Sequence, residues 1–506
     1  MSRDLPARAN LEHLKKQAKA LLRDVRQHEP DAIRRFREFV SKQESSANNL
    51  ADAQHVIARE YGFATWSALK EQVETRAVTT DPFEALAAAV RADDVSRVAA
   101  VLRTHRELKS RLNDPMPGGD FGAPVLGPAI HRQNREMIDL LLRHGADVNA
   151  RSHWWAGSFG ALDLCDPELA PFLIERGARV DAHSAARLGM LDRLDALVTT
   201  DPDLVHARGG DGQTPLHFAS TLEIAQYLLA HGADIDARDV DHESTPAQYM
   251  VGSRQDIARF LVERGCRTDI LMAAALGDVD RVRRHLEDDP ASIRTRVSEE
   301  YFPMRDARAG GTIYIWTLGR AKTAYAVARA FGHDDVFRLL SERSPDVLRL
   351  VQACIVGDEA VVDDLIARRP EIAHDLSSDE LSAVVDAAED DNTSAVRRML
   401  AVGWPVDAQR TDGATALHFA AWLGNAELVR ELVGRGAPLE PVEHTFNATP
   451  LDWALHGSRN SPRASSGDYA GVVEALLGKG ANVSRVADKP DVSDAVLEVL
   501  RRHGVS

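Results

Sequence analysis

The sequence predicts an all-α protein built from a repeated pair of helices. Residues 412–440 read DGATALHFAAWLGNAELVRELVGRGAPLE, and residues 211–237 read DGQTPLHFASTLEIAQYLLAHGADIDA. In both segments a polar turn precedes a short alanine-containing stretch, and a longer stretch follows with Leu, Val and Ile at helical spacing. Because whole segments recur along the chain, we expect an array of helix-turn-helix units.

Each part of the unit has a physical reason. Thr214 can cap the first helix, and Pro215 occupies a first-turn position that needs no N–H donor. Leu428 and Leu432, one turn apart, place an apolar stripe of the second helix against the next unit. Gly436 then ends that helix at a left-handed position before a hairpin-like connection, called a finger below.

The TPLHxA start, the apolar second helix and the GAD-like end resemble the ankyrin repeat. This resemblance covers approximately residues 80–506. It implies a solenoid whose inner helices and fingers form a concave groove that binds other proteins. We expect about twelve units, with residues 492–506 as a closing half-repeat. The units begin near residues 83, 121, 153, 183, 211, 241, 270, 320, 347, 379, 411 and 446.

Some units keep the two-helix rhythm without the signature, and three of them end with Pro202, Pro290 and Pro370 in place of the usual glycine. The alternation in TIYIW within the insertion 296–320 predicts an enlarged finger with a β-ribbon. Residues 457–469 are expected to form a flexible loop inside the twelfth unit. The predicted domains are a helical module over 1–78, a first array half over 79–295, the insertion 296–320, and a second array half over 321–506.

Residues 1–78 do not repeat and are predicted to form a small helical module. Leu11, Leu14, Ala18, Leu21 and Leu22 share one face of a helix, with basic residues opposite. The segment resembles a helical leader that precedes ankyrin arrays in bacterial proteins. We expect it to cap the first repeat, because terminal units of a solenoid need a polar outer face. Its alternative interpretation is a helix-turn-helix that binds DNA.

Charge and cysteine content narrow the classes of function. The net charge is −16; residues 1–78 carry 14 Lys and Arg against 11 Asp and Glu, so the remaining chain carries −19. An acidic body of this kind repels phosphate backbones, which makes nucleic acid an unlikely partner. Three widely spaced cysteines without a CxxC pair, and no signal peptide or long apolar run, favour a cytoplasmic protein without a membrane segment.

The sequence shows no motif for catalysis, a cofactor or a metal. It contains no GxxxxGK[ST], HExxH, GxGxxG or GxSxG pattern. The acidic run 234–244, DIDARDVDHES, lacks the glycine and the terminal glutamate of a calcium loop and is expected to be a finger. In the ankyrin pattern, His217 and His418 begin inner helices and link adjacent repeats by hydrogen bonds. We therefore predict no catalytic residue, no cofactor and no metal ligand.

The ankyrin pattern implies which positions face the groove. These are the residues that follow the TPLHxAA stretch and the residues of the fingers. Trp422 is the favoured anchor for a partner, whereas Trp453 is expected to be a core residue. Trp154 and Trp155 have the alternative role of covering a packing defect. The predicted partner-binding residues are His131, Arg132, Trp154, Trp155, Arg187, Tyr314, Trp316, Trp422, Leu423, Phe446 and His456.

Three functions from different classes remain open at this point. The leading one is a non-catalytic protein-interaction scaffold whose groove and fingers bind a protein partner. The second is a small-molecule-binding protein or cofactor-free enzyme with a site built from groove aromatics and histidines, and a closed pocket would distinguish it. The third is a regulator that binds DNA through residues 1–78.

Overall fold

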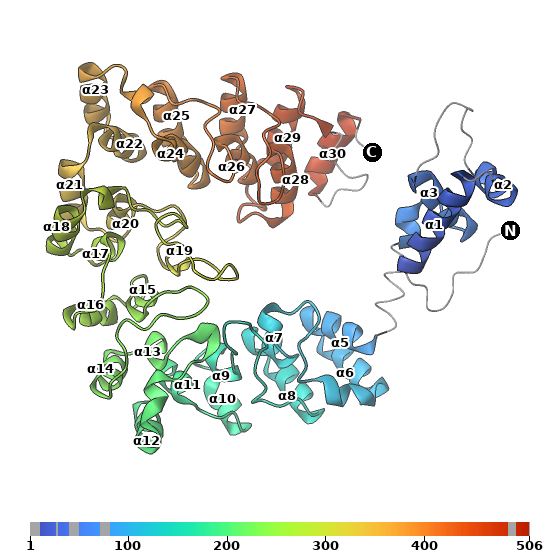
Figure 1. Cartoon of the computed structure of the whole chain (residues 1–506), viewed down its shortest axis with the longest axis horizontal. Coiled ribbons are helices and arrows are strands. Elements are labelled where there is room, and N and C mark those ends of the chain that lie inside the picture. The colour runs from blue at the N-terminus through green and yellow to red at the C-terminus, as the bar shows by residue number, and fades with distance from the viewer. Residues whose placement is uncertain (1–10, 27–28, 40–49, 71–80, 484–491, 505–506) are drawn as a thin grey trace. The chain divides into compact units, whose positions relative to one another are not determined.

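The computed structural model describes residues 11–26, 29–39, 50–70, 81–483 and 492–504. Two compact units make up the chain (Figure 1). Unit 1 comprises Met1–Met250, Asp256–Cys266 and Met304–Ile313. Unit 2 comprises Val251–Gln255, Arg267–Pro303 and Tyr314–Ser506. The insertion therefore contributes its middle to unit 1 and its flanks to unit 2.

The N-terminal module has a core of its own. It contains α1 (Leu11–Arg26), α2 (Pro30–Phe39) and α3 (Leu50–Glu60). Leu14, Ala18, Leu21 and Leu22 are buried on one face of α1, as the sequence predicted, while the side chain of Leu11 lies outside the described residues. That the module caps the first repeat stays a prediction.

The array consists of twelve helix pairs within the described residues, which confirms the predicted number of units. Repeats 1–6 lie in unit 1 and repeats 7–12 in unit 2. A thirteenth inner helix, α30 (Asp494–Arg502), closes the array as the predicted half-repeat. The pairs are α5/α6 (Pro82–Arg91, Val95–Thr104), α7/α8 (Leu126–His131, Arg135–Arg143), α9/α10 (Ala161–Leu164, Ala170–Glu175), α11/α12 (Ala182–Arg187, Leu191–Thr200), α13/α14 (Pro215–Phe218, Leu222–Ala230), α15/α16 (Pro246–Met250, Gln255–Glu263), α17/α18 (Ile270–Leu276, Val279–Asp288), α20/α21 (Ala324–Ala330, Asp334–Arg343), α22/α23 (Asp346–Val356, Glu359–Arg368), α24/α25 (Ser378–Glu389, Thr393–Ala401), α26/α27 (Ala416–Trp422, Ala426–Gly434) and α28/α29 (Pro450–Asn460, Tyr469–Leu477).

The local chemistry of a consensus repeat agrees with the sequence pattern. Pro215 begins α13, and Thr214 and His217 satisfy each other's polar groups at the helix start. Gly232 and Gly436 end their repeats with φ near 90° and 89°, in the left-handed region that a residue with a Cβ avoids. These devices place each inner helix and finger at a repeated position.

The fingers are tight backbone turns and not strands. In the described residues the only β pairings are isolated bridges, Arg296 with Thr323 and Gln409 with Thr415. Each finger takes the number of the repeat whose inner helix follows it. Finger 5 is closed by a hydrogen bond from Gly209 N to Gln213 O (2.9 Å), and finger 6 by one from Asp239 N to Ser244 O (3.1 Å). Neighbouring fingers are joined by further backbone hydrogen bonds.

The repeats with a degenerate sequence are built differently from the consensus repeats. In repeats 4, 7 and 9 the inner helices α11, α17 and α22 follow the preceding helix with little room for a finger. The same repeats end in the 3-10 turns η3 (Pro202–His206), η5 (Pro290–Arg294) and η6 (Ile372–Asp375). The proline-containing ends that the sequence analysis noted therefore mark a second type of repeat.

The β-ribbon predicted for the insertion is wrong. Residues of TIYIW enter a single helical turn, α19 (Tyr314–Thr317). The Tyr314 ring is fully buried and packs edge-on against Phe302 at 5.3 Å, and its hydroxyl donates to Asp269 Oδ2 at 2.8 Å. Packing of this tyrosine overrides the β-propensity of its neighbours. The predicted loop 457–469 is also shorter than expected, because Gly457 and Ser458 are buried inside α28.

Candidate partner-binding surface

A cavity of about 690 Å³ opens beside finger 2 in unit 1. Its walls come from finger 2, helix α7, finger 3 and helix α9. Finger 2 is closed by Met116 N donating to Ala123 O (2.9 Å), and finger 3 by Ser152 N donating to Phe159 O (2.8 Å). The volume lies in the range of sites that accept a bulky side chain or a small molecule.

Phe121 is the most unusual residue of this cavity. It has φ 54° and precedes Gly122 with φ 61°, which is a type I′ turn whose first position favours Asn, Asp or Gly. A bulky residue in this region carries backbone strain on the order of 1–3 kcal/mol. The ring is nevertheless 44% exposed, and Leu164 on the same cavity is 50% exposed. Strain retained beside an exposed apolar surface is typical of a binding site.

An aromatic cluster supports Phe121 from behind. Its ring lies edge-on to Trp154 at 5.0 Å and to Phe159 at 5.7 Å. Trp154 and Trp155 are half-buried, and the guanidinium of Arg308 lies 4.2 Å from the centre of a Trp155 ring. Trp154 therefore packs directly against Phe121, and Trp155 packs against Trp154 at 6.3 Å and against Arg308. Partner binding by either tryptophan stays a prediction.

Among the predicted basic residues of unit 1, the arginines donate hydrogen bonds to backbone carbonyls, whereas His131 is exposed to solvent. Arg132 donates to the carbonyls of Val90 (3.0 Å) and Arg91 (2.9 Å), and Arg187 donates to the carbonyl of Cys165 (2.6 Å). These guanidinium groups satisfy the ends of neighbouring inner helices. Arg91 donates to the carbonyl of Pro117, and His131 is exposed at the cavity lining. The structure thus brings His131 and Arg132 to the cavity and places Arg187 one repeat away.

A second aromatic surface lies in unit 2 on repeats 11 and 12. Trp422 is half-buried and stacks on the exposed His456 at 5.7 Å, with Trp453 edge-on at 6.3 Å. Trp453 is also half-buried, so the prediction that it is a core residue holds only for the edge that faces Phe419. Leu423 is half-buried beside Trp422. This surface contains three of the predicted residues and one that the sequence analysis assigned elsewhere.

The remaining predicted residues separate into exposed and buried. Phe446 in finger 12 is 76% exposed, and Trp316 in α19 is 61% exposed. Tyr314 is fully buried with its hydroxyl on Asp269, so its prediction as a partner-binding residue is wrong. The error has the same cause as the predicted β-ribbon, because a strand would have turned Tyr314 and Trp316 to one face.

The two consensus histidines are structural, as predicted. His217 Nδ1 accepts from Thr214 N at 3.1 Å, and its Nε2 donates to Ser244 O of the next repeat at 3.1 Å. His418 has the same arrangement with Thr415 and Ala448. Burial lowers the pKa of His418, so its neutral form is favoured.

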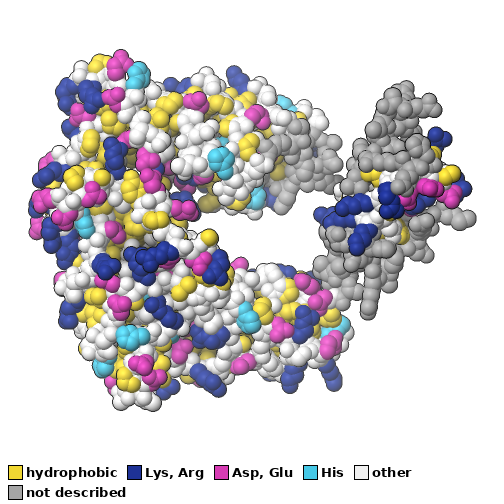
Figure 2. Space-filling view, viewed as in Figure 1, with side chains coloured by type: hydrophobic (Ala, Val, Ile, Leu, Met, Phe, Trp, Pro, Cys, Tyr) yellow, Lys and Arg dark blue, Asp and Glu magenta, His cyan; other side chains and the backbone are white. Residues whose placement is uncertain are grey.

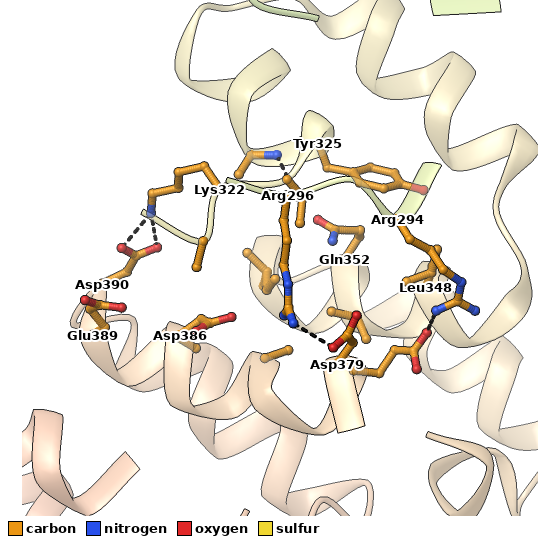
Figure 3. A pocket seen from close by; sticks show the side chains of 18 of the residues that line it. Arg294, Arg296, Lys322, Tyr325, Leu348, Gln352, Asp379, Asp386, Glu389 and Asp390 are labelled. Carbon is orange, nitrogen blue, oxygen red and sulfur yellow. Dashed lines mark hydrogen bonds and ion pairs between the residues drawn. The ribbon is translucent and has the colours of Figure 1, made fainter. Parts of the chain in front are cut away.

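A smaller cavity of about 120 Å³ in unit 2 is filled by ion pairs (Figure 3). It forms where repeats 9 and 10 have no hairpin finger, between the flanks of the insertion, helix α22 and helix α24. Arg296 Nη2 lies 2.6 Å from Asp379 Oδ1, and Lys322 Nζ lies 2.6 Å from Asp390 Oδ1. These opposite charges neutralise one another. The ion pairs therefore link repeats that have no hairpin finger between them.

Acidic and basic side chains are mixed on the surface of the repeats. Figure 2 shows acidic and basic side chains interspersed over both units, while Lys and Arg side chains gather on the visible face of the N-terminal module.

In the part of the chain that the structure describes, no helix is long and apolar enough to cross a bilayer.

Comparison with known proteins identifies the repeats. The model of three ankyrin repeats matches residues 182–272, 350–443 and 387–487, and the single ankyrin-repeat model matches 129–153. Together they cover about half of the chain, and the helix pairs and fingers agree with them. The chain therefore belongs to the ankyrin-repeat proteins, whose repeats generally mediate protein interactions.

The curated relatives match over short segments. The chain is 33% identical over 132 residues to the Ankyrin repeat and KH domain-containing protein mask-1 of Caenorhabditis elegans, covering 26% of this chain and 5% of the relative. It is 31% identical over 135 residues to Palmitoyltransferase Hip14 of Drosophila melanogaster, covering 26% of this chain and 20% of that protein. The chain thus spans less than a quarter of either relative. A solved structure of the human ASB11 ankyrin repeat domain has 19% identity and a TM-score of 0.24, covering 60% of this chain and 99% of that one.

Proposed function

We propose that this protein is a non-catalytic interaction scaffold and that the cavity beside finger 2 receives an apolar side chain of a protein partner. The observation that carries the proposal is the exposed, left-handed Phe121 at the cavity, held by Trp154 and Phe159. Aromatic residues on a rigid support are typical hot spots of protein interfaces. An extended partner segment running over fingers 2 and 3 would place one anchor in the cavity.

The basic residues at the cavity define the partner further. Arg91 and Arg132 are held by backbone carbonyls, so their positive charges are fixed at the rim. A carboxylate next to the apolar anchor of the partner would meet this charge. The proposed partner is therefore a peptide segment with an aromatic or aliphatic residue flanked by an acidic one.

Selection of peptides from a displayed random library against the full chain tests this proposal. Phe121→Asn removes the ring and introduces a residue that accepts the left-handed turn, so the fold is retained. We expect Kd of the selected peptides to rise about 30-fold, which corresponds to about 2 kcal/mol for a hot spot. The control Phe446→Asn removes an exposed finger aromatic from unit 2 and should leave Kd unchanged. Equal binding by wild type and Phe121→Asn would contradict the proposal.

A small molecule is the second candidate, because the cavity volume fits one. A fragment screen against the wild-type chain and Phe121→Asn separates the two. Saturable fragment binding in the absence of any selected peptide would favour the small-molecule site. The DNA-binding function of residues 1–78 is not proposed, since the remaining chain has a net charge of −19.

We also retain two predictions, one about the cellular compartment of the protein and one about the resemblance of residues 1–78 to a bacterial leader. Cys165, Cys266 and Cys354 are buried and none of them forms a disulfide, which supports a reducing, cytoplasmic compartment. The resemblance of residues 1–78 to a leader of bacterial ankyrin proteins stays a prediction, whereas the relatives named above are animal proteins. Mass spectrometry of intact protein from its native host would test both the thiol state and the processing of this segment.

A further inference from the structure

Two acidic residues and a histidine meet where fingers 5 and 6 pack together. Asp211 lies at the tip of finger 5, and Asp241 and His242 lie in finger 6. One side-chain ligand atom of each residue lies within 4.8 Å of the others. The arrangement is fixed by the backbone, since Val240 N donates to Asp211 O at 2.7 Å. Sequence analysis found no metal motif here, because the three residues come from two repeats.

The imidazole of His242 is oriented by the insertion. Its Nδ1 lies 2.8 Å from the carbonyl oxygen of Gly311. A carbonyl only accepts, so Nδ1 carries a proton and donates, and Nε2 faces Asp241 Oδ2 at 3.6 Å. A histidine that ligates a metal commonly donates its other ring N–H to a backbone carbonyl in this way.

Asp241 is buried and Asp211 is half-buried, and neither carboxylate is fully hydrogen-bonded. Oδ1 of Asp241 and Oδ1 of Asp211 have no hydrogen-bond partner, and the Asp241 side chain is only 7% exposed. Burial raises the pKa of Asp211 to about 6, and the charge of His242 opposes this shift. The Trp154 indole opposes it weakly, without a hydrogen bond of normal geometry. A buried carboxylate in this state requires a proton or a cation.

Neighbouring cationic side chains are engaged elsewhere. Arg208 Nη1 donates to the carbonyls of Gly212 (2.6 Å) and Arg238 (2.5 Å), and Arg238 donates to the carbonyl of Glu243 (3.0 Å). Asp239 is saturated by its own donors, which include Ser244 N at 2.7 Å and Tyr249 Oη at 3.1 Å. The negative charge of Asp211 and Asp241 therefore faces His242 and not an arginine.

Residues Gly310 and Gly311 of the insertion contact Asp241 and His242. Gly310 N donates to Asp241 O at 2.9 Å. A Cβ at Gly310 would lie 3.2 Å from Asp241 Oδ2 and 3.2 Å from His242 Cε1, which is closer than ordinary van der Waals contact. The insertion therefore packs tightly against the carboxylate and the imidazole.

We propose that Asp211, Asp241 and His242 bind one divalent metal ion, with Zn²⁺ as the ion best matched to two carboxylates and an imidazole. Zinc accepts this mixture of oxygen and nitrogen ligands, and three protein ligands leave a fourth position for water or a partner group. The ion joins finger 5 to finger 6, and the Gly311 carbonyl holds the imidazole in place. None of the three proposed ligands lines the proposed peptide-binding cavity.

Calorimetric titration of the chelator-treated full chain with ZnCl₂ tests the proposal, with MnCl₂ and MgCl₂ in parallel. We expect one tight zinc equivalent that weakens by about 100-fold or more in Asp241→Asn and in His242→Ala, since even outer partners of a metal contribute 10–100-fold. Asp412→Asn, at the matching finger position of repeat 11, should bind zinc as wild type does. Substitution with Co²⁺ should give a visible absorption band that is absent from Asp241→Asn.

One further variant and a thermal melt test the zinc site even if one of the ligand variants is less stable than wild type. Gly310→Ala keeps all three ligands and should also weaken zinc binding, because its Cβ would press on Asp241 Oδ2 and His242 Cε1 and shift both side chains. Without zinc, Asp241→Asn should unfold at the same temperature as wild type or higher, since it removes one of two like charges. Zinc binding that is equal in wild type, Asp241→Asn and His242→Ala would mean adventitious binding and would overturn the site. Binding of Mg²⁺ alone, unaffected by His242→Ala, would also overturn it.

Discussion

Fingers 5 and 6 of unit 1 and fingers 11 and 12 of unit 2 share one backbone design and differ in what lies beside a half-buried aspartate, Asp211 or Asp412. In the first pair Val240 N donates to Asp211 O at 2.7 Å; in the second pair His444 N donates to Asp412 O, also at 2.7 Å. Asp412 is paired with Arg410 at 2.9 Å. Burial acts to raise the pKa of Asp412, but the hydrogen bonds from Arg410 and from Ala414 N, together with the charge of Arg410, outweigh it and lower the pKa.

The position of Arg410 is occupied by Gly209 in finger 5. A Cβ there would lie 2.9 Å from Cδ2 of His183, which begins the fingerless repeat 4. The missing finger of repeat 4 thus brings a histidine beneath finger 5 and excludes an arginine. In finger 6, Asp241 and His242 stand where finger 12 has Thr445 and Phe446. The same scaffold therefore balances charge with an arginine in unit 2 and, as we propose, with a metal ion in unit 1.

The largest expected effect comes from removing the arginine of the second pair. Arg410 pairs with Asp412, with Glu389 at 2.7 Å and with Asp386 at 3.6 Å, and its side chain is mostly buried. Arg410→Ala leaves three carboxylates without this partner and should destabilise the protein by about 3–5 kcal/mol. Urea denaturation followed by circular dichroism measures this loss. Arg430→Ala, at an exposed pair with Asp468, is the control and should cost less than about 1 kcal/mol.

The pH dependence of stability gives the next effect. Burial raises the pKa of Asp386 to about 6, opposed by the charges of Arg410 and Arg296. The folded state then binds more protons than the unfolded state between pH 4 and 6, so this residue lowers stability as pH rises through that window. The loss amounts to about 3 kcal/mol and is constant above the window. Denaturation of Asp386→Asn and wild type from pH 4 to 7 should show a difference that grows in favour of the variant, and parallel curves would contradict the account.

The smallest effects compare two aromatic residues of repeats 11 and 12. Trp422 touches the rings of Trp453 and His456, so Trp422→Ala should cost about 1–2 kcal/mol of folding stability. Phe446→Ala removes an exposed ring and should change stability by less than about 0.5 kcal/mol. Thermal melts measure both. A cost for Trp422→Ala of about 4 kcal/mol would make it a core residue and exclude it as a partner anchor.

The periodic pattern of the sequence was enough to predict the solenoid of twelve helix pairs. Helix caps, apolar stripes and terminal glycines are local signals, and they predicted the twelve repeats and the structural roles of His217 and His418. The prolines at degenerate repeat ends also marked the 3-10 turns correctly. Local signals failed in TIYIW, where alternation suggested a strand but burial of Tyr314 produced a helical turn.

The candidate sites depend on contacts between repeats, which periodicity does not contain. The cavity beside Phe121 requires two fingers and two inner helices at once, although an aromatic at a turn position of an ankyrin finger was a visible signal. The cluster of Asp211 with Asp241 and His242 requires knowing that finger 6 hydrogen-bonds to the tip of finger 5. Alignment of the two finger pairs would have shown the glycine in place of Arg410 but not the imidazole orientation that Gly311 imposes.

Anomalous diffraction at the zinc edge, from crystals of the chain grown with ZnCl₂, tests the central comparison most directly. The account predicts a peak between the side chains of Asp211, Asp241 and His242 and no peak beside Asp412 in the matching finger pair. Absence of a peak at the first position, or equal peaks at both, would contradict the claim that the two finger pairs balance their buried charge in different ways.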